Sequence, residues 1–177
     1  MRAKNEVAQV AIIDVNGRTL LEQFVKNKDP ISDCMTCISG VRASDLVDAD
    51  SCEAAAEAVE ETINGKILVG HSLKGDLKQL GLEETKKAIL WDIAELPFLQ
   101  RPDGTKTSLG HQFFALTGLN VQANAHNPLA DAAATLTVLL AFIKEATRYF
   151  ANPAKYKMSP RAWAFRHRLV ETINEFG

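Results

Sequence analysis

The sequence has 177 residues, of which 46% are hydrophobic and 24% charged, and its formal net charge is −2 at pH 7. These values are typical of one folded domain. They exclude the class of strongly basic proteins that bind nucleic acid mainly through an overall positive charge. No apolar run is long enough to span a bilayer, and the first ten residues lack the apolar segment of a signal peptide. We therefore expect an intracellular protein, nuclear or cytoplasmic.

The first half of the chain alternates strand and helix patterns. Residues 6–25 predict two strands joined at Asn16-Gly17, a dipeptide that favours tight hairpins. Residues 48–65 predict an amphipathic helix that begins with an Asp50/Glu53 capping box and ends at glycine. A short buried strand is expected at 66–70, and a short helix at 72–81.

The second half continues the alternation with a strand at 87–92, a helix at 107–118 and a long helix at 126–150 that has a proline in its first turn. This order predicts an α/β fold in which an antiparallel pair joins parallel strands of a mixed sheet flanked by helices. With no repeat or linker in the sequence, we expect one domain over 1–150. Residues 151–177 are expected to form a C-terminal helical extension packed on that domain.

Two acidic positions are placed where chemistry is expected. Asp76 follows a buried strand that ends near His71, and Asp131 lies about one turn inside the long helix that His126 approaches. Side chains near helix N-termini can converge above a sheet, where two carboxylates could share Mg²⁺ ions and a neutral histidine could take a proton from water. Taken singly, each acid is more simply a helix cap and each histidine a polar loop residue.

The segments around these acids resemble the DEDDh family of 3′–5′ exonucleases, in the RNA exonuclease 4-like and interferon-stimulated exonuclease branch. "ILVGHSLKGDLKQL" is similar to the branch's second motif, and "AHNPLADAAATL" is similar to its third motif, H-x-x-x-x-D. "SGVRASDL", "AILWD" and "TSLGHQFF" are similar to its connecting segments. The resemblance runs from about residue 7 to residue 142.

This resemblance implies a ribonuclease H-like fold and a metal site. Asp76 and Asp131 would bind metal, His126 would be the general base, and His71 would contact nucleic acid. The cofactor of an active enzyme would be Mg²⁺ or Mn²⁺.

The family's first motif, D-x-E on the opening strand, has no counterpart in this sequence. The hairpin at 7–25 matches the family's second and third strands, so we expect the first strand to be absent or replaced. An alternative alignment makes "VAIIDVNG" the first strand, with Asp14 as a metal ligand and Asn16 in the place of the second acid.

A second departure lies in the loop "SDCMTCISG", where the branch has a Tyr-Arg-x-Arg pattern. Here Cys34, Met35 and Cys37 take those positions, and they cannot give the bidentate hydrogen bonds that arginine gives to phosphate. The cysteines have no partner pair at zinc-site spacing, so free thiols are expected.

Three functional interpretations remain open. The first is a degenerate pseudo-exonuclease with little or no catalysis that binds RNA or a protein partner. The second is an active 3′–5′ RNA exonuclease whose D-x-E strand lies outside this chain. The third is other metal chemistry with Glu60, Glu61 or Asp92 as replacement ligands.

The tail and the sheet each suggest a partner. Arg161, Arg166 and Arg168 lie among aromatic residues, a composition suited to single-stranded RNA, although the aromatics could instead dock the last helix on the core. If the central first strand is missing, two strand edges face an open slot. We expect this slot to be closed by a segment of the same chain or by a strand from a second copy. The second route would give a homodimer.

Overall fold

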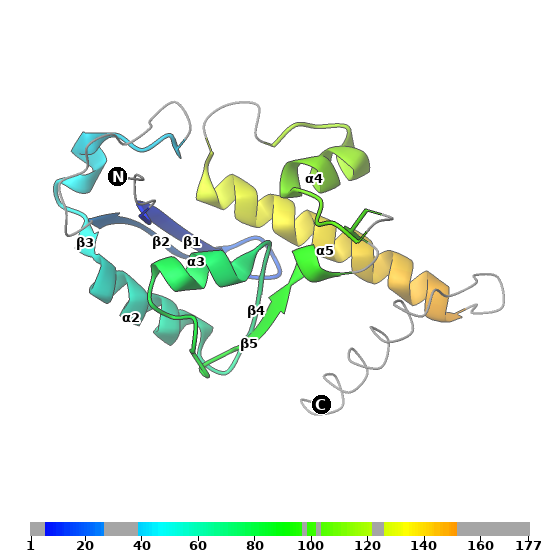
Figure 1. Ribbon diagram of the computed structural model, residues 1–177, viewed down its shortest axis with the longest axis horizontal. Helices are drawn as coiled ribbons and strands as arrows, with labels where there is room; N and C mark the ends of the chain where they lie inside the picture. The colour runs from blue at the N-terminus through cyan, green and yellow to red at the C-terminus, as the bar shows by residue number, and fades with distance from the viewer. Residues whose placement is uncertain (1–5, 27–38, 97–98, 102–103, 122–125, 152–177) are drawn as a thin grey trace.

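The computed structural model describes residues 6–26, 39–96, 99–101, 104–121 and 126–151, without the side chains of residues 145 and 148–151 (Figure 1). The strands are β1 (Gln9–Ile13), β2 (Thr19–Lys26), β3 (Asp50–Ser51), β4 (Ile67–Gly70) and β5 (Ile89–Asp92). The helices are α2 (Cys52–Ile63), α3 (Leu73–Gln79), α4 (Leu109–Thr117) and α5 (Pro128–Ala151), with 3₁₀ turns η1 (Ala43–Leu46) and η2 (Ile93–Glu95).

The predicted hairpin is confirmed. β1 and β2 pair in antiparallel fashion, and the amide of Gly17 donates to the carbonyl of Asp14 over 2.9 Å. Gly17 has a φ of 80°, a left-handed conformation that glycine adopts without steric cost. Asn16-Gly17 therefore closes the hairpin because its glycine adopts the left-handed conformation that a tight turn requires.

Helix α2 forms where it was predicted, but the predicted cap is wrong. Ser51, not Asp50, is the N-cap, and its hydroxyl accepts a hydrogen bond from the amide of Ala54. Asp50 belongs to β3, which pairs with the end of β2. Three residues on one face of α2 are buried, as its periodicity predicted, and the helix packs on β2: Ala55, Val59 and Ile63.

The described strands form two separate sheets, with the orders β1-β2-β3 and β4-β5. β4 and β5 are parallel, with Gly70 opposite Asp92 at their carboxyl ends. Within the described ranges no ladder joins β1 to β4. The mixed α/β architecture is confirmed. "VAIIDV" forms a hairpin strand, not one that pairs with β4.

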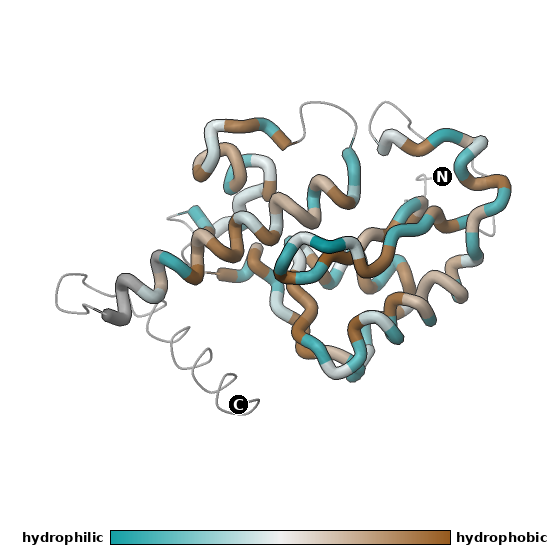
Figure 2. The backbone as a smooth tube through the Cα atoms, turned by 180° about the vertical axis from the view of Figure 1, so that it is seen from behind, coloured by the Kyte–Doolittle hydropathy of each residue, from teal (hydrophilic) through white to brown (hydrophobic). Residues whose placement is uncertain are grey.

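Helix α5 runs diagonally across the molecule, contacts both β1 and β4, and packs beside α4 (Figure 1). Its tube alternates between hydrophobic and hydrophilic colours, as expected for a helix with one face in the core (Figure 2). The core beneath it joins α5 to η2 and α4 through seven buried residues: Ile93, Leu96, Leu109, Ala134, Val138, Leu139 and Phe142.

None of the helices in the described ranges combines the length and apolarity needed to cross a membrane. The C-terminal extension expected at 151–177 lies outside the described residues from residue 152 onward, with its arginines, as do Cys34, Met35 and Cys37; Ala151 is the last residue of α5.

Candidate active site

A sharp turn from β4 into α3 places the first acid. A Cβ on Gly70 would lie 2.8 Å from Cδ1 and 3.2 Å from Cβ of Leu73, so a larger residue at this position would force the buried Leu73 side chain to shift. Ser72 has a φ of 62°, a left-handed conformation that is uncommon for a residue other than glycine. The tight turn places Asp76 in the first turn of α3, directly beyond the end of β4.

Asp92 fixes this turn from the neighbouring strand. Its Oδ1 accepts hydrogen bonds from the amide of Ser72 over 2.8 Å and from the amide of Ala94 over 2.9 Å. One carboxylate oxygen thus connects the end of β5 to the turn before α3 and also caps η2. This arrangement matches a structural role for Asp92 more closely than a role as a replacement metal ligand.

His71 connects the same turn to the segment that precedes α4. Its Nε2 lies 2.9 Å from the carbonyl oxygen of Thr107, and its Nδ1 lies 3.4 Å from the hydroxyl of Ser72. Because a carbonyl only accepts, Nε2 must carry the proton in this contact. The predicted contact of His71 with nucleic acid stays a prediction.

The second acid lies at the start of α5. The side-chain oxygen of Asn127 accepts from the amides of Leu129 and Ala130 over 2.9 and 3.2 Å, which caps the helix. Asp131 follows in the first turn, where the helix dipole favours a negative charge. Its Oδ2 lies 3.3 Å from Nδ1 of His126, so the two residues of the H-x-x-x-x-D motif face each other.

The electrostatics of Asp76 show that these groups share one neighbourhood. Burial, and next the charge of Asp92, raise the pKa of Asp76; His71 lowers it and Asp131 raises it. Asp76 has an exposed side chain by surface area, yet desolvation is still the largest effect on its carboxylate. The structure thus brings together both predicted metal ligands, with Asp92 beside them.

These groups do not complete a metal site. Within the described ranges, no three His, Cys, Asp or Glu side chains are grouped so that they could hold one metal ion. The resemblance described above implies Mg²⁺ or Mn²⁺ at this site, and hard cations such as Mg²⁺ need several oxygen ligands. Asp76 and Asp131 supply two carboxylates, whereas Asp92 already uses one oxygen for two backbone amides.

Asp14, the metal ligand of the alternative alignment, serves the hairpin turn. Its Oδ1 accepts from the amides of Asn16 and Arg18 over 2.8 and 2.9 Å. The backbone hydrogen bond from Arg18 is the largest effect that lowers the pKa of Asp14, and no charge from Asp76 or Asp131 acts on it. The alternative alignment stays a prediction to which this geometry adds no support.

The third interpretation also named two glutamates on α2. Glu60 accepts a hydrogen bond of 2.8 Å from the hydroxyl of Thr85, which ties α2 to the loop before β5. Neither Glu60 nor Glu61 is among the groups whose charges shift the pKa of Asp76. These contacts suit a structural role for Glu60.

One charged pair near the carboxylates was not predicted from the sequence. Nζ of Lys106 lies 2.5 Å from Oε1 of Glu95, and the charge of Asp92 contributes to raising the pKa of Lys106 after the larger effect of Glu95. Glu95 ends the three-residue turn η2 and Lys106 lies in an irregular segment, so no periodic pattern marks either residue.

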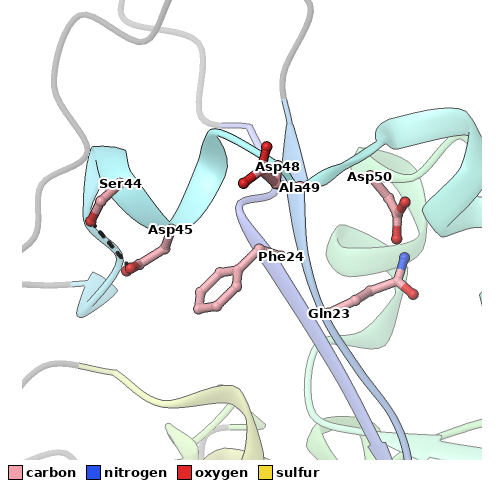
Figure 3. Close-up of a pocket in the computed structure, with 7 residues that line it drawn as sticks. All are labelled: Gln23, Phe24, Ser44, Asp45, Asp48, Ala49 and Asp50. Atoms are coloured by element: carbon pink, nitrogen blue, oxygen red, sulfur yellow. Dashed lines mark hydrogen bonds between the residues drawn. The ribbon is translucent and has the colours of Figure 1, made fainter.

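A separate acidic pocket lies on the other sheet (Figure 3). Its lining comes from β2, η1 and the segment before α2, and includes Asp45, Asp48 and Asp50. The Nε2 of Gln23 is buried and has no hydrogen-bond partner among the described residues. Neither Asp76 nor Asp131 lines this pocket, so the two acids belong to a different surface.

Comparison with known proteins places these observations in a family. Residues 2–139 match the Exonuclease family (RNase_T). RNA exonuclease 4 of Mus musculus is 32% identical over 145 residues, which cover 82% of this chain and 34% of the relative. RNA exonuclease 4 of Homo sapiens is 33% identical over 138 residues, which cover 78% of this chain and 33% of the relative. The chain thus spans about a third of the length of these relatives.

Solved structures agree on the fold. The Neurospora crassa Pan2 catalytic unit, with protease and nuclease domains, matches with a TM-score of 0.68 at 20% identity, over 87% of this chain and 27% of that one. The Saccharomyces cerevisiae Pan2 pseudoubiquitin hydrolase-RNA exonuclease module, in complex with AAGGAA RNA, matches with a TM-score of 0.65 at 23% identity, over 87% and 29%. Together with the family match over most of the chain, they confirm the ribonuclease H-like fold and the family resemblance: the chain belongs to the exonuclease family, as a member of the DEDDh 3′–5′ type.

Proposed function

We propose that this chain binds the 3′ end of single-stranded RNA at the surface formed by Asp76, Asp131 and His126, and that by itself it hydrolyses RNA little or not at all. The observation that carries the proposal is the incomplete carboxylate group, which lies in the right motifs but has too few ligands. The RNA exonuclease 4 relatives and the RNA-bound Pan2 neighbours support RNA as the ligand class.

The charge balance supports weak metal binding. Two Mg²⁺ ions carry four positive charges, against which Asp76 and Asp131 offer two negative ones. Mg²⁺ gives up its water reluctantly, so partial occupancy is the expected state. Because metal activation supplies many orders of magnitude of rate in this kind of chemistry, a chain with an incomplete site should hydrolyse near the background rate.

A second candidate is favoured by the divided sheet. β1 and β4 each have one edge that no described strand pairs with, and both strands contact α5. A strand that carries a D-x-E pair between them would add two acids beside Asp76 and Asp131. A longer protein or another chain could supply it, and the assembly would then be an active metal-dependent exonuclease.

His126 is suited to the general-base role in that assembly. A neutral imidazole that donates its Nδ1 proton to Asp131 has Nε2 as its basic nitrogen. Asp131 would hold the ring in that tautomer. The same pair has no hydrolytic role in the first candidate, where it only lines the RNA surface.

A nuclease assay separates the two candidates. We expect a 3′-labelled RNA ladder to remain unshortened by the 177-residue chain in Mg²⁺ or Mn²⁺, because the metal site is incomplete. A fusion that adds a strand with D-x-E before β1 should shorten the ladder one nucleotide at a time if the second candidate holds.

Variants of the two acids control this assay. Shortening by the unfused chain that disappears in both Asp76→Ala and Asp131→Ala would contradict the first candidate. Asp48→Ala is the matched control, because it removes a carboxylate from the separate acidic pocket, which neither Asp76 nor Asp131 lines. A fusion that binds RNA but leaves the ladder intact would contradict the second candidate.

A further inference from the structure

The loop before α4 is fixed against the carboxylate group. The amide of Arg101 donates to the carbonyl of Thr105 over 2.9 Å, and the amide of Gly104 donates back to the carbonyl of Arg101 over 2.8 Å. The carbonyl of Thr107 is bound by His71 at the end of β4. Lys106 lies between these two anchored residues, so its backbone is held beside the turn that places Asp76.

Lys106 and its counterion Glu95 lie close to Asp92, whose charge contributes to raising the pKa of Lys106 after the larger effect of Glu95. Glu95 ends η2, which starts directly after Asp92, and pairs with Lys106 over 2.5 Å. The two side chains are 50% and 59% exposed. An ion pair so open to solvent contributes little to stability, so Lys106 can leave Glu95 for another anion without weakening the fold.

We infer that Lys106 contacts a phosphate of bound RNA and that Glu95 is the counterion which the phosphate displaces. The inference rests on the proposed RNA-binding function. Acidic groups on this surface repel a polyanion, and a nearby cation offsets that repulsion. Lysine binds phosphate as a point charge on a flexible stem, and an exposed, weakly held ion pair can exchange its partner at little cost.

This exchange predicts changes of opposite sign. Lys106→Gln removes a phosphate contact and should weaken RNA binding several-fold, with a smaller dependence of log K on log salt, by about 0.7 per lost contact to a single strand. Glu95→Gln removes the competing carboxylate and should tighten binding. Lys106→Arg should retain the affinity. In the double variant, the gain from Glu95→Gln should disappear, because the group that it releases is gone.

The measurement is fluorescence anisotropy of a 5′-labelled 12-nucleotide RNA with the full chain, in EDTA, at several salt concentrations. Lys87→Gln is the matched control: Lys87 is exposed and precedes β5, at the end of the strand opposite to Asp92, and its loss should leave the salt dependence unchanged.

Three outcomes would overturn the inference. Weakened binding in both Lys106→Gln and Glu95→Gln would show that the ion pair only supports the loop. An unchanged salt dependence in Lys106→Gln would show that no phosphate is contacted there. If the wild-type chain does not bind the RNA at all, the proposed function fails and the inference with it, whereas the first two outcomes leave RNA binding intact.

Discussion

At the scale of single residues, Asp92 has the widest effect on the site. It holds the amide of Ser72 in a left-handed turn, and its charge acts on both Asp76 and Lys106. A carboxylate with these contacts orders the turn and also sets the local field. The position and pKa of Asp76, an acid of the family motif, therefore depend on Asp92, which lies outside that motif.

Replacing Asp76 should stabilise the free protein at neutral pH. Because burial and the charge of Asp92 raise the pKa of Asp76 above its ordinary 3.8, the folded state binds the proton more tightly than the unfolded state. Stability then falls as pH rises from 3.8 through the raised value. We expect Asp76→Asn to raise the melting temperature in EDTA at pH 7 and to lose this advantage below pH 3.8.

Asp14→Asn provides a control of opposite sign. The hydrogen bond from Arg18 lowers the pKa of Asp14, so its charged form stabilises the turn above the ordinary pKa, and that contribution is lost as pH falls through the lowered value. Asp14→Asn should therefore lower the melting temperature at neutral pH. A change of the same sign in both variants, or one that is independent of pH, would contradict the assignment for Asp76.

Residue-level prediction from the sequence succeeded where geometry is local. The H-x-x-x-x-D spacing placed His126 opposite Asp131 because both lie within the first turn of one helix and its approach. The cap of α2 was misassigned because Asp50 and Ser51 are both good caps, and pairing with β2, a distant contact, decides between them. The ion pair of Lys106 was not predicted because its partner, Glu95, lies eleven positions away at the end of η2, a turn too short to carry a periodic pattern.

At the scale of elements, α5 carries both the core and the second acid. Ala134 and Val138 are buried on its inner face, whereas its start holds the exposed Asn127 cap and the partly buried Asp131. Its apolar period and its first-turn proline were readable in the sequence. The short elements β3, η1 and η2 were not, because two to four residues carry no period.

The cap of α5 should matter to both stability and RNA binding. Asn127→Ala removes the acceptor for two helix amides and should cost about 1 kcal/mol of stability, or a few degrees in melting temperature for a protein of this size. Because Asp131 follows in the same turn, we also expect weaker RNA binding by anisotropy.

Ser51→Ala is the matched control for this prediction. Ser51 caps α2, which packs on β2 rather than at the carboxylates, so its loss should cost similar stability and leave RNA binding unchanged. Equal binding losses in both variants would mean that RNA affinity follows overall stability. The position of the first turn of α5 would then have no special role.

At the scale of the whole molecule, the division between β1 and β4 is the main departure from a continuous sheet. The family resemblance led us to expect a gap at this place, but which group closes it could not be predicted, because closure is a long-range contact. Direct pairing of the two strands is not seen among the described residues. Residues 1–5 lie outside them, so closure by the N-terminus, like the homodimer, stays a prediction.

Self-association should follow from the unpaired edges. Exposed strand edges recruit other strands, so light scattering should show the mass of the chain rising toward that of a dimer with concentration. Ile67 is 51% exposed on β4, and Ile67→Lys should suppress the association, because a charged residue discourages edge pairing. Leu116→Lys on α4, at a position 49% exposed, should not. A monomer at every concentration would contradict the homodimer.

The route of α5 across both sheets has a mechanical consequence. Asp76 follows a strand of one sheet, whereas Asp131 belongs to a helix that also contacts the other sheet. No ladder among the described strands fixes the distance between the halves, so side-chain packing under α5 sets it. Packing yields to changes of volume more readily than a hydrogen-bonded lattice does. The distance between the carboxylates of Asp76 and Asp131 is therefore the part of the site that deforms most easily. Core substitutions far from either acid can change it.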